Sequence, residues 1–119
     1  SCGYCNLPLN VGRHEMSRNE IREAFANLYE DGLRVVFVQG GEPLLRRDLI
    51  AILEDLHKIG FHLTVITNGT KLTLPLVKQF DDLGISLSVS LDTLDPSTYE
   101  RIRGADQLAV VLAGLELLD

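Results

Sequence analysis

Several features that mark common protein classes are missing from this 119-residue chain. It has only two cysteines, Cys2 and Cys5, which in a reducing compartment suit a metal or redox site better than a structural disulfide. Its 11 basic residues are outnumbered by 17 acidic ones, so a nucleic-acid backbone or an anionic lipid surface is a poor partner. The sequence has neither an apolar run of membrane-spanning length nor a basic, apolar leader. These absences predict a cytoplasmic protein that binds neither nucleic acid nor membrane.

Glycine patterns that bind nucleotide phosphates are missing too, because the chain contains neither GxGxxG nor a P-loop. What remains is an ordinary globular composition, with 45% apolar residues, 24% charged residues, ten glycines and four prolines. The length suits one compact domain or a piece of a larger one. We therefore interpret residues 1–119 as a single domain.

Apolar residues recur with helical and strand periods in turn. Ser17 and Glu20 have the spacing of a capping box at a helix start. The β-branched and aromatic run at residues 35–38 predicts a strand covered on both faces of a parallel sheet, and residues 61–66 and 85–91 predict two more strands. The apolar stripes of four predicted helices are Ile21, Ala24, Phe25 and Leu28; Leu49, Ile52, Leu53 and Leu56; Leu76, Phe80 and Leu83; and Leu108, Val111, Leu112 and Leu115.

The spacing of these elements indicates the fold class. The strands begin near Val35, Phe61 and Ile85, which are 26 and 24 residues apart. Such spacings are typical of repeated βα units with right-handed crossovers and parallel strands. The last of the four helices, which carries the stripe from Leu108 to Leu115, is expected to begin with Asp95 as N-cap and Pro96 as first helical residue. The sequence therefore predicts an α/β fold of parallel βα repeats, either a sheet layer or a barrel segment.

Unusual polar and glycine residues follow each predicted strand. They are Gly40, Gly41 and Glu42 after the first, Thr67, Asn68 and Gly69 after the second, and Ser90 and Asp92 at the third. In parallel α/β folds ligands bind beyond the carboxyl ends of the strands, so one shared site is expected there. Glycine lets the backbone approach a ligand closely, and Glu42 favours a cationic group such as the ammonium of an amino acid.

A purely structural interpretation of these residues stays open. Gly40 and Gly41 can form a tight turn, Glu42 can complement a helix dipole, and Pro43 can start the second helix. For the polar residues after the other two strands, each cluster taken alone favours turn formation and capping over a binding role.

The CxxC formed by Cys2 and Cys5 has three interpretations, namely half a zinc site, a redox pair or iron–sulfur ligation. A zinc site needs two more donors, and the only histidines, His14, His57 and His62, are widely scattered. A thioredoxin-type pair normally follows a strand and opens a helix, whereas residues 6–16 resemble a loop. Iron–sulfur ligation fits best.

Taken together, the motifs SCGYCNLP, VVFVQGGEPLLRRDL, VITNGT and SVSLDTLDPSTYERIRG resemble the radical S-adenosylmethionine (SAM) superfamily. The likeness is greatest to the branch with the molybdenum-cofactor GTP cyclase, the haem-pathway enzymes and the SPASM-type peptide-maturing enzymes. It implies a (β/α)6 partial TIM barrel and a [4Fe-4S] cluster held by CxxxCxxC. By resemblance, Cys2 and Cys5 are cluster ligands and Tyr4 lies against the adenine of SAM.

The resemblance also assigns roles at the strand ends. Gly40, Gly41 and Glu42 match the motif that binds the SAM amino group. Thr67 and Ser90 match positions that contact the ribose or methionyl group, with Asn68 and Asp92 as neighbours. The implied reaction is reductive cleavage of SAM to a 5′-deoxyadenosyl radical, which takes hydrogen from an unknown small-molecule or peptide substrate. It implies an electron donor such as flavodoxin or ferredoxin.

Two departures from the family pattern lead us to expect an excerpt from a larger enzyme, truncated at both ends and inactive alone. The first cluster cysteine is expected upstream of Ser1, and three of six barrel strands are missing. Arg101 and Arg103 are expected on a solvated helix face. Two alternatives remain: a non-catalytic α/β module with a zinc or redox CxxC, and a degenerate radical SAM scaffold that acts as a binding protein.

Overall fold

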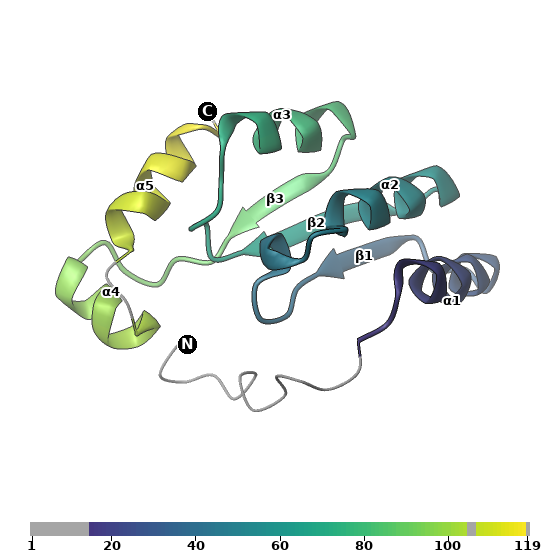
Figure 1. Ribbon diagram of the computed structural model, residues 1–119, viewed down its shortest axis with the longest axis horizontal. Helices are drawn as coiled ribbons and strands as arrows, with labels where there is room; N and C mark the ends of the chain where they lie inside the picture. Colours follow the sequence, from purple (N-terminus) through teal and green to yellow (C-terminus); the bar gives the residue numbers. More distant parts are fainter. Residues whose placement is uncertain (1–14, 105–106, 119) are drawn as a thin grey trace.

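A computed structural model describes residues 15–104 and 107–118 of the chain. Three parallel strands form one sheet in the order β1-β2-β3, with helices along it (Figure 1). The elements are α1 (Arg18–Glu30), β1 (Val35–Val38), the 3-10 helix η2 (Pro43–Leu45), α2 (Leu49–Ile59), β2 (His62–Thr67), α3 (Leu74–Asp82), β3 (Ser86–Val89), α4 (Pro96–Arg103) and α5 (Leu108–Glu116). The predicted α/β fold of parallel βα repeats is confirmed.

Local sequence signals account for most element boundaries. Ser17 and Glu20 form the predicted capping box at the start of α1. Gly60, with φ of 122°, ends α2 in a conformation that costs a glycine little. Among the helices of the described residues, none is long and apolar enough to cross a membrane.

The C-terminal part differs from the prediction, which expected one helix after the third strand. Two helices, α4 and α5, are present instead. Gly104 has a left-handed conformation, with φ of 80°, and caps α4 after Arg103. A helix cannot pass through that conformation, so the apolar stripe from Leu108 belongs to a separate helix. In Figure 1 α4 and α5 lie on the left, the side toward which the strand arrowheads point.

The core lies on one face of the sheet only. Alternate strand residues, among them the buried Leu63 and Val65, pack there against α2 and α3. Leu53 and Phe80, which are 0% and 1% exposed, supply the largest buried side chains from those helices. α1 joins this layer from the side through partly buried residues such as Phe25, whose ring meets that of Phe61 edge to face.

The other face of the sheet is open, which corrects the prediction that residues 35–38 are covered on both faces. Val35 is 49% exposed and Phe37 is 61% exposed. Strand pairing aligns Phe37 with Thr64, and Thr64 with Ser86, so these side chains share one face. We call this face the open wall; it comprises Val35, Phe37, His62, Thr64, Ile66, Ser86 and Ser88.

An ion pair between Arg18 and Asp55 joins α1 to α2. Arg18 donates two hydrogen bonds to Asp55, from Nε to Oδ2 at 2.7 Å and from Nη2 to Oδ1 at 3.0 Å. The hydrogen bond from Arg18 lowers the pKa of the Asp55 carboxyl, against the opposing effect of desolvation. Since the folded state favours the charged carboxylate, this pair stabilises the protein at neutral pH.

Asp55→Asn should therefore lower the urea midpoint of unfolding at pH 7. The contribution of Asp55 is fully present above its ordinary pKa of 3.8 and disappears as the pH falls through the lower folded pKa. The difference between wild type and variant should shrink correspondingly in urea titrations between pH 7 and pH 3. Asp81→Asn, at an exposed position on α3, is the matched control and should leave the midpoint unchanged. A difference for Asp55→Asn that is independent of pH would contradict this account.

Candidate functional site

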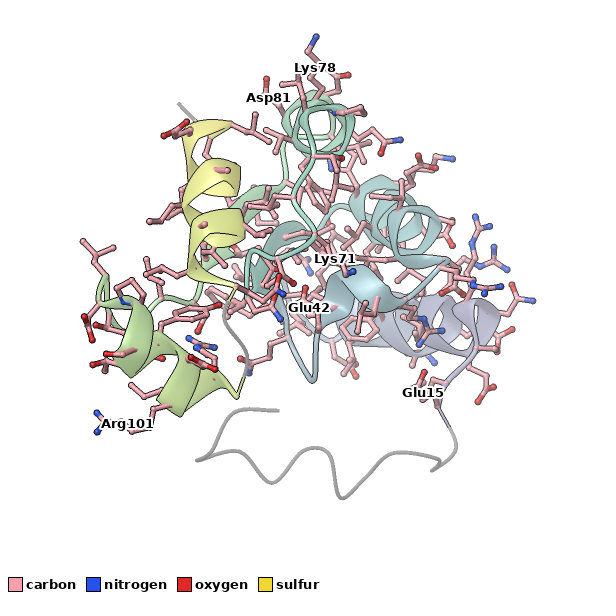
Figure 2. The ribbon with its side chains drawn as sticks, turned by 60° about the vertical axis from the view of Figure 1, so that its left-hand side comes forward. Glu15, Glu42, Lys71, Lys78, Asp81 and Arg101 are labelled. Carbon is pink, nitrogen blue, oxygen red and sulfur yellow. The ribbon has the colours of Figure 1, made fainter. Side chains whose placement is uncertain are left out.

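The carboxylate of Glu42 joins the exits of the first two strands. Its Oε1 accepts hydrogen bonds from the Thr67 hydroxyl at 2.6 Å and from the Leu44 amide at 3.2 Å. Its Oε2 accepts one from the Asn68 amide at 2.8 Å. These bonds hold the loop after β1 against the end of β2. Glu42 is partly buried and its label lies near the middle of the view in Figure 2, whereas Arg101 projects outward from α4.

The Glu42 carboxylate retains capacity for a further donor. It accepts three hydrogen bonds from the chain, and a carboxylate has about four acceptor positions. Within the described residues, the ion pairs of Arg18, Arg46 and Arg103 go to other carboxylates, and no basic side chain pairs with Glu42. The carboxylate is therefore oriented by neutral donors and can accept a hydrogen bond from a cationic ligand.

Gly40 and Gly41, which precede Glu42, leave space beside the loop. A Cβ atom added to either glycine would meet no heavy atom of the described chain within 4 Å. Gly40 has φ of 152°, so its backbone conformation favours glycine. No such restriction applies to Gly41, whose lack of a side chain is required neither by packing nor by a positive φ. Open space next to an acceptor group suits the close approach of a ligand.

Thr67 ends β2 and is only 1% exposed. Besides donating to Glu42, its hydroxyl accepts a hydrogen bond from the Gly69 amide at 3.2 Å. Asn68 is turned toward its own loop, where its Oδ1 accepts from the amide of Thr70 at 2.9 Å and from the hydroxyl at 2.7 Å. The absence of a side chain at Gly69 has a packing reason, since a Cβ atom there would lie 3.0 Å from a methyl group of Val89.

The exit of β3 is held by an arginine that was expected from the sequence on a solvated face. The side chain of Arg103 is only 10% exposed. Its Nη2 lies 2.9 Å from both the carbonyl oxygen and the hydroxyl of Ser90, and 2.8 Å from Oδ2 of Asp92. For Arg103 the expectation was wrong, whereas Arg101 is exposed as predicted. The sequence signal that could have indicated this is Gly104, which ends α4 after eight residues. The helix is therefore only about 12 Å long, so that Arg103 at its C-terminal end stays within reach of the end of β3.

The three strand exits form one rim, as the sequence predicted. Glu42 contacts Thr67 and Asn68 directly, and the Ser90 amide donates to the Thr67 carbonyl at 2.8 Å. Arg103 then connects Ser90 to Asp92. The structural alternative is confirmed in part: Pro43 opens a helix, the 3-10 helix η2, and Glu42 is its N-cap, with the carboxylate accepting from the Leu44 amide. It is wrong only in that this helix is separate from α2, which begins at Leu49.

The predicted cluster and adenine residues, Cys2, Tyr4 and Cys5, lie outside the described residues, as do His14 and the loop through residue 14. In the described ranges, no three or more His, Cys, Asp or Glu side chains gather in a way that could hold a metal ion. His57 lies on α2 and His62 on β2.

Arg46 ties the loop of the rim to the segment that precedes α1. Its Nε donates to Oδ1 of Asp48 at 2.6 Å, and its Nη2 donates to the Met16 carbonyl at 2.7 Å. The hydrogen bond from Arg46 lowers the pKa of the Asp48 carboxyl. These contacts hold the start of α1 near the loop that carries Glu42.

Comparison with known proteins gives a consistent result. The family model described as the Radical SAM superfamily matches residues 1–119. A probable GTP 3′,8-cyclase of Methanothermobacter marburgensis is 37% identical over 98% of this chain and 39% of its own length. A GTP 3′,8-cyclase of Tolumonas auensis is 38% identical over 97% of this chain and 36% of its own length. The chain thus spans less than two fifths of the length of these relatives.

The fold has a counterpart among solved structures. The structure described as native anSMEcpe with bound AdoMet matches 98% of this chain and 36% of its own chain, with a TM-score of 0.77 and 21% sequence identity. At that identity the likeness concerns the fold. The parallel βα repeats seen here therefore match a segment of that larger structure.

Proposed function

This chain belongs to the radical SAM superfamily, and we propose that it forms part of the core domain of an enzyme that cleaves SAM reductively. Members of this superfamily use a [4Fe-4S] cluster and SAM. The fold is the α/β arrangement of parallel repeats found in the partial TIM barrel of such enzymes. We propose that the protein draws electrons from a reductant such as flavodoxin or ferredoxin and works in the cytoplasm.

The observation that carries this proposal is the Glu42 carboxylate beside two glycines. SAM has an ammonium group, which needs acceptors of negative charge and access to the backbone. Glu42 accepts hydrogen bonds from three neutral donors of the chain and has room for one more. Gly40 and Gly41 leave the adjacent space open. The described residues fit the amino end of SAM.

The residues at the end of β3 suit the second charged group of the SAM methionyl moiety, which is its carboxylate. The SAM carboxylate needs a positive counter-charge, and Arg103 supplies one at Ser90. Asp92 orients that guanidinium from 2.8 Å. Thr67 acts mainly as a positioning residue, because its buried hydroxyl is committed to Glu42. Asn68 contributes its backbone amide to the same carboxylate. We propose the roles of ammonium binding for Glu42 and carboxylate binding for Ser90 and Arg103.

Cys2 and Cys5 are proposed as thiolate ligands of the cluster, with Tyr4 beside the adenine. A cluster held by these thiolates would supply the electron for reductive cleavage of SAM to methionine and a 5′-deoxyadenosyl radical. The residues of the rim orient SAM through its two charged groups, so that the reactive carbon has one position. The relatives' names make GTP one candidate substrate.

The proposal is tested on the full-length natural protein, purified without oxygen. We expect stoichiometric iron and sulfide, and formation of 5′-deoxyadenosine from SAM once a reductant such as dithionite is added. Protein that contains zinc instead of iron, or a complete cluster that leaves SAM intact under reduction, would overturn the proposal. The first outcome points to a zinc module and the second to a scaffold that has lost its reaction.

A further inference from the structure

Glu42 and Arg46 lie at the two ends of the short helix η2. Glu42 is the N-cap of this helix, and Arg46 is its C-cap, whose backbone amide donates to the Pro43 carbonyl at 3.0 Å. The Glu42 carboxylate accepts from the Leu44 amide within the same turn. A 3-10 turn has poorer hydrogen-bond geometry than an α-helix and does little to fix itself. A contact that holds Arg46 in place therefore also restricts the position of the Glu42 carboxylate.

The guanidinium of Arg46 joins η2 to another part of the chain. Its Nη2 donates to the carbonyl oxygen of Met16, 30 positions earlier in the sequence, at 2.7 Å. Its Nε donates to Oδ1 of Asp48 at 2.6 Å, and a carboxylate oxygen of Glu15 lies 3.8 Å from Nη1. One planar group thus donates in two directions at once, which the single ammonium of a lysine cannot reproduce.

The residues that Arg46 contacts belong to the stretch between the cysteines and α1. In the sequence, residues 15 and 16 follow the segment that carries Cys2 and Cys5, and α1 begins two residues later at Arg18. α1 is itself fixed to α2 by an ion pair. Arg46 therefore attaches the residues that follow the cysteine-bearing segment to the turn that carries the ammonium acceptor.

We propose that Arg46 is a positioning residue for SAM, which acts by holding η2 and its N-cap Glu42 against the residues that follow the cysteines. This inference rests on the proposed function, in which Glu42 binds the SAM ammonium. An acceptor that is ordered before the ligand arrives saves the cost of ordering it on binding. Without the guanidinium the Glu42 carboxylate is still present, but its turn is less restricted. Arg46 itself makes no contact with SAM in this proposal.

Arg46→Gln tests the proposal in the full-length holoenzyme. The KM for SAM should rise about tenfold while kcat stays within about twofold of wild type, because the acceptor is displaced and the chemistry is untouched. Equilibrium dialysis of labelled SAM against the unreduced holoenzyme should show the same loss of affinity. Arg47→Gln is the matched control: it removes the same charge from the next residue, which makes no ion pair among the described residues. It should leave KM and affinity unchanged.

A double variant shows whether Arg46 acts through Glu42. If it does, Arg46→Gln should add little to the rise in KM caused by Glu42→Gln, because the carboxylate that it positions is already lost. Hydrogen exchange of the metal-free protein gives a measurement that is independent of activity. The backbone amides of residues 44–46 should exchange faster in Arg46→Gln than in Arg47→Gln. Arg46→Lys keeps the charge, should recover only part of the SAM affinity, and carries the test if Arg46→Gln does not fold.

Three results would overturn the proposal. One is wild-type SAM affinity in Arg46→Gln or Arg46→Lys. Another is a pair of KM effects that multiply in the double variant, since Arg46 would then act independently of Glu42. The third is a lower Tm and iron content in Arg46→Gln while the iron-loaded fraction binds SAM as wild type does, which indicates a structural role only. The wild type tests the proposed function separately: a complete cluster that leaves SAM intact under reduction contradicts that function and not the placement of Arg46.

Discussion

Replacing Glu42 with glutamine should raise the KM for SAM about 100-fold while the iron content stays at the wild-type level. A hydrogen bond to a charged group contributes about 1.5–3 kcal/mol, and each 1.4 kcal/mol is a factor of ten. The substitution also turns an acceptor into an amide N–H donor that faces either the ammonium or the Asn68 amide. Reductive cleavage assays over a range of SAM concentrations measure the effect.

Two further variants separate binding from folding. Asp95→Asn removes a carboxylate that caps α4 through Thr98 and should leave the KM for SAM unchanged. Gly41→Ala adds a methyl group where the described chain offers no contact, so it should preserve Tm yet weaken SAM binding. An unchanged KM for SAM in both Glu42→Gln and Gly41→Ala would show that Gly41 and Glu42 are not part of the SAM site.

The position of the rim could be predicted because glycine and polar residues directly follow each apolar strand in the sequence. An apolar run that ends in Gly40, Gly41 and Glu42 predicts a strand followed by a loop, and the carboxyl ends of parallel strands necessarily meet at one edge. The pattern therefore located the rim correctly. Which contacts form there was not predictable, since it depends on side-chain distances across the sheet, such as the 2.6 Å between the Thr67 hydroxyl and Glu42.

Arg103 illustrates what a local pattern omits. In sequence it shares a short polar helix with Arg101, and both arginines have the same local surroundings. Only the path of the chain, which returns toward β3 at the Gly104 stop, brings one of them to Ser90 and Asp92. Long-range placement of this kind is set by tertiary structure.

The open wall shows a second limit. The sequence of β1 is apolar at every position, which is typical of a strand buried on both faces. The structure covers Val36 and Val38 with helices but leaves Phe37 exposed, and the pattern contains no information on what covers the second face. Exposure on that face is therefore a finding of the structure.

Replacing Cys5 with alanine should remove the cluster altogether: iron and sulfide fall to background and no 5′-deoxyadenosine forms. Cluster irons are held by cysteine thiolates, so a site that loses one of its three ligands has too few donors to retain four irons. Iron and sulfide are measured on protein purified without oxygen. Tyr4→Phe, which keeps the aromatic ring next to the thiol, is the control and should retain full iron content.

Glu42→Gln and Cys5→Ala should have opposite effects on cluster content and SAM affinity, because the proposed site has two separate parts. Glu42→Gln keeps the cluster and loses SAM affinity, whereas Cys5→Ala loses the cluster and keeps the hydrogen bonds that Glu42 makes with Thr67 and Asn68. The Cys5→Ala protein should therefore match the metal-free wild type in its urea midpoint. Full cleavage activity in Cys5→Ala would refute its role as a ligand. If the wild type contains zinc and no iron, and Cys5→Ala loses that zinc, the result would favour a zinc module built on the same fold.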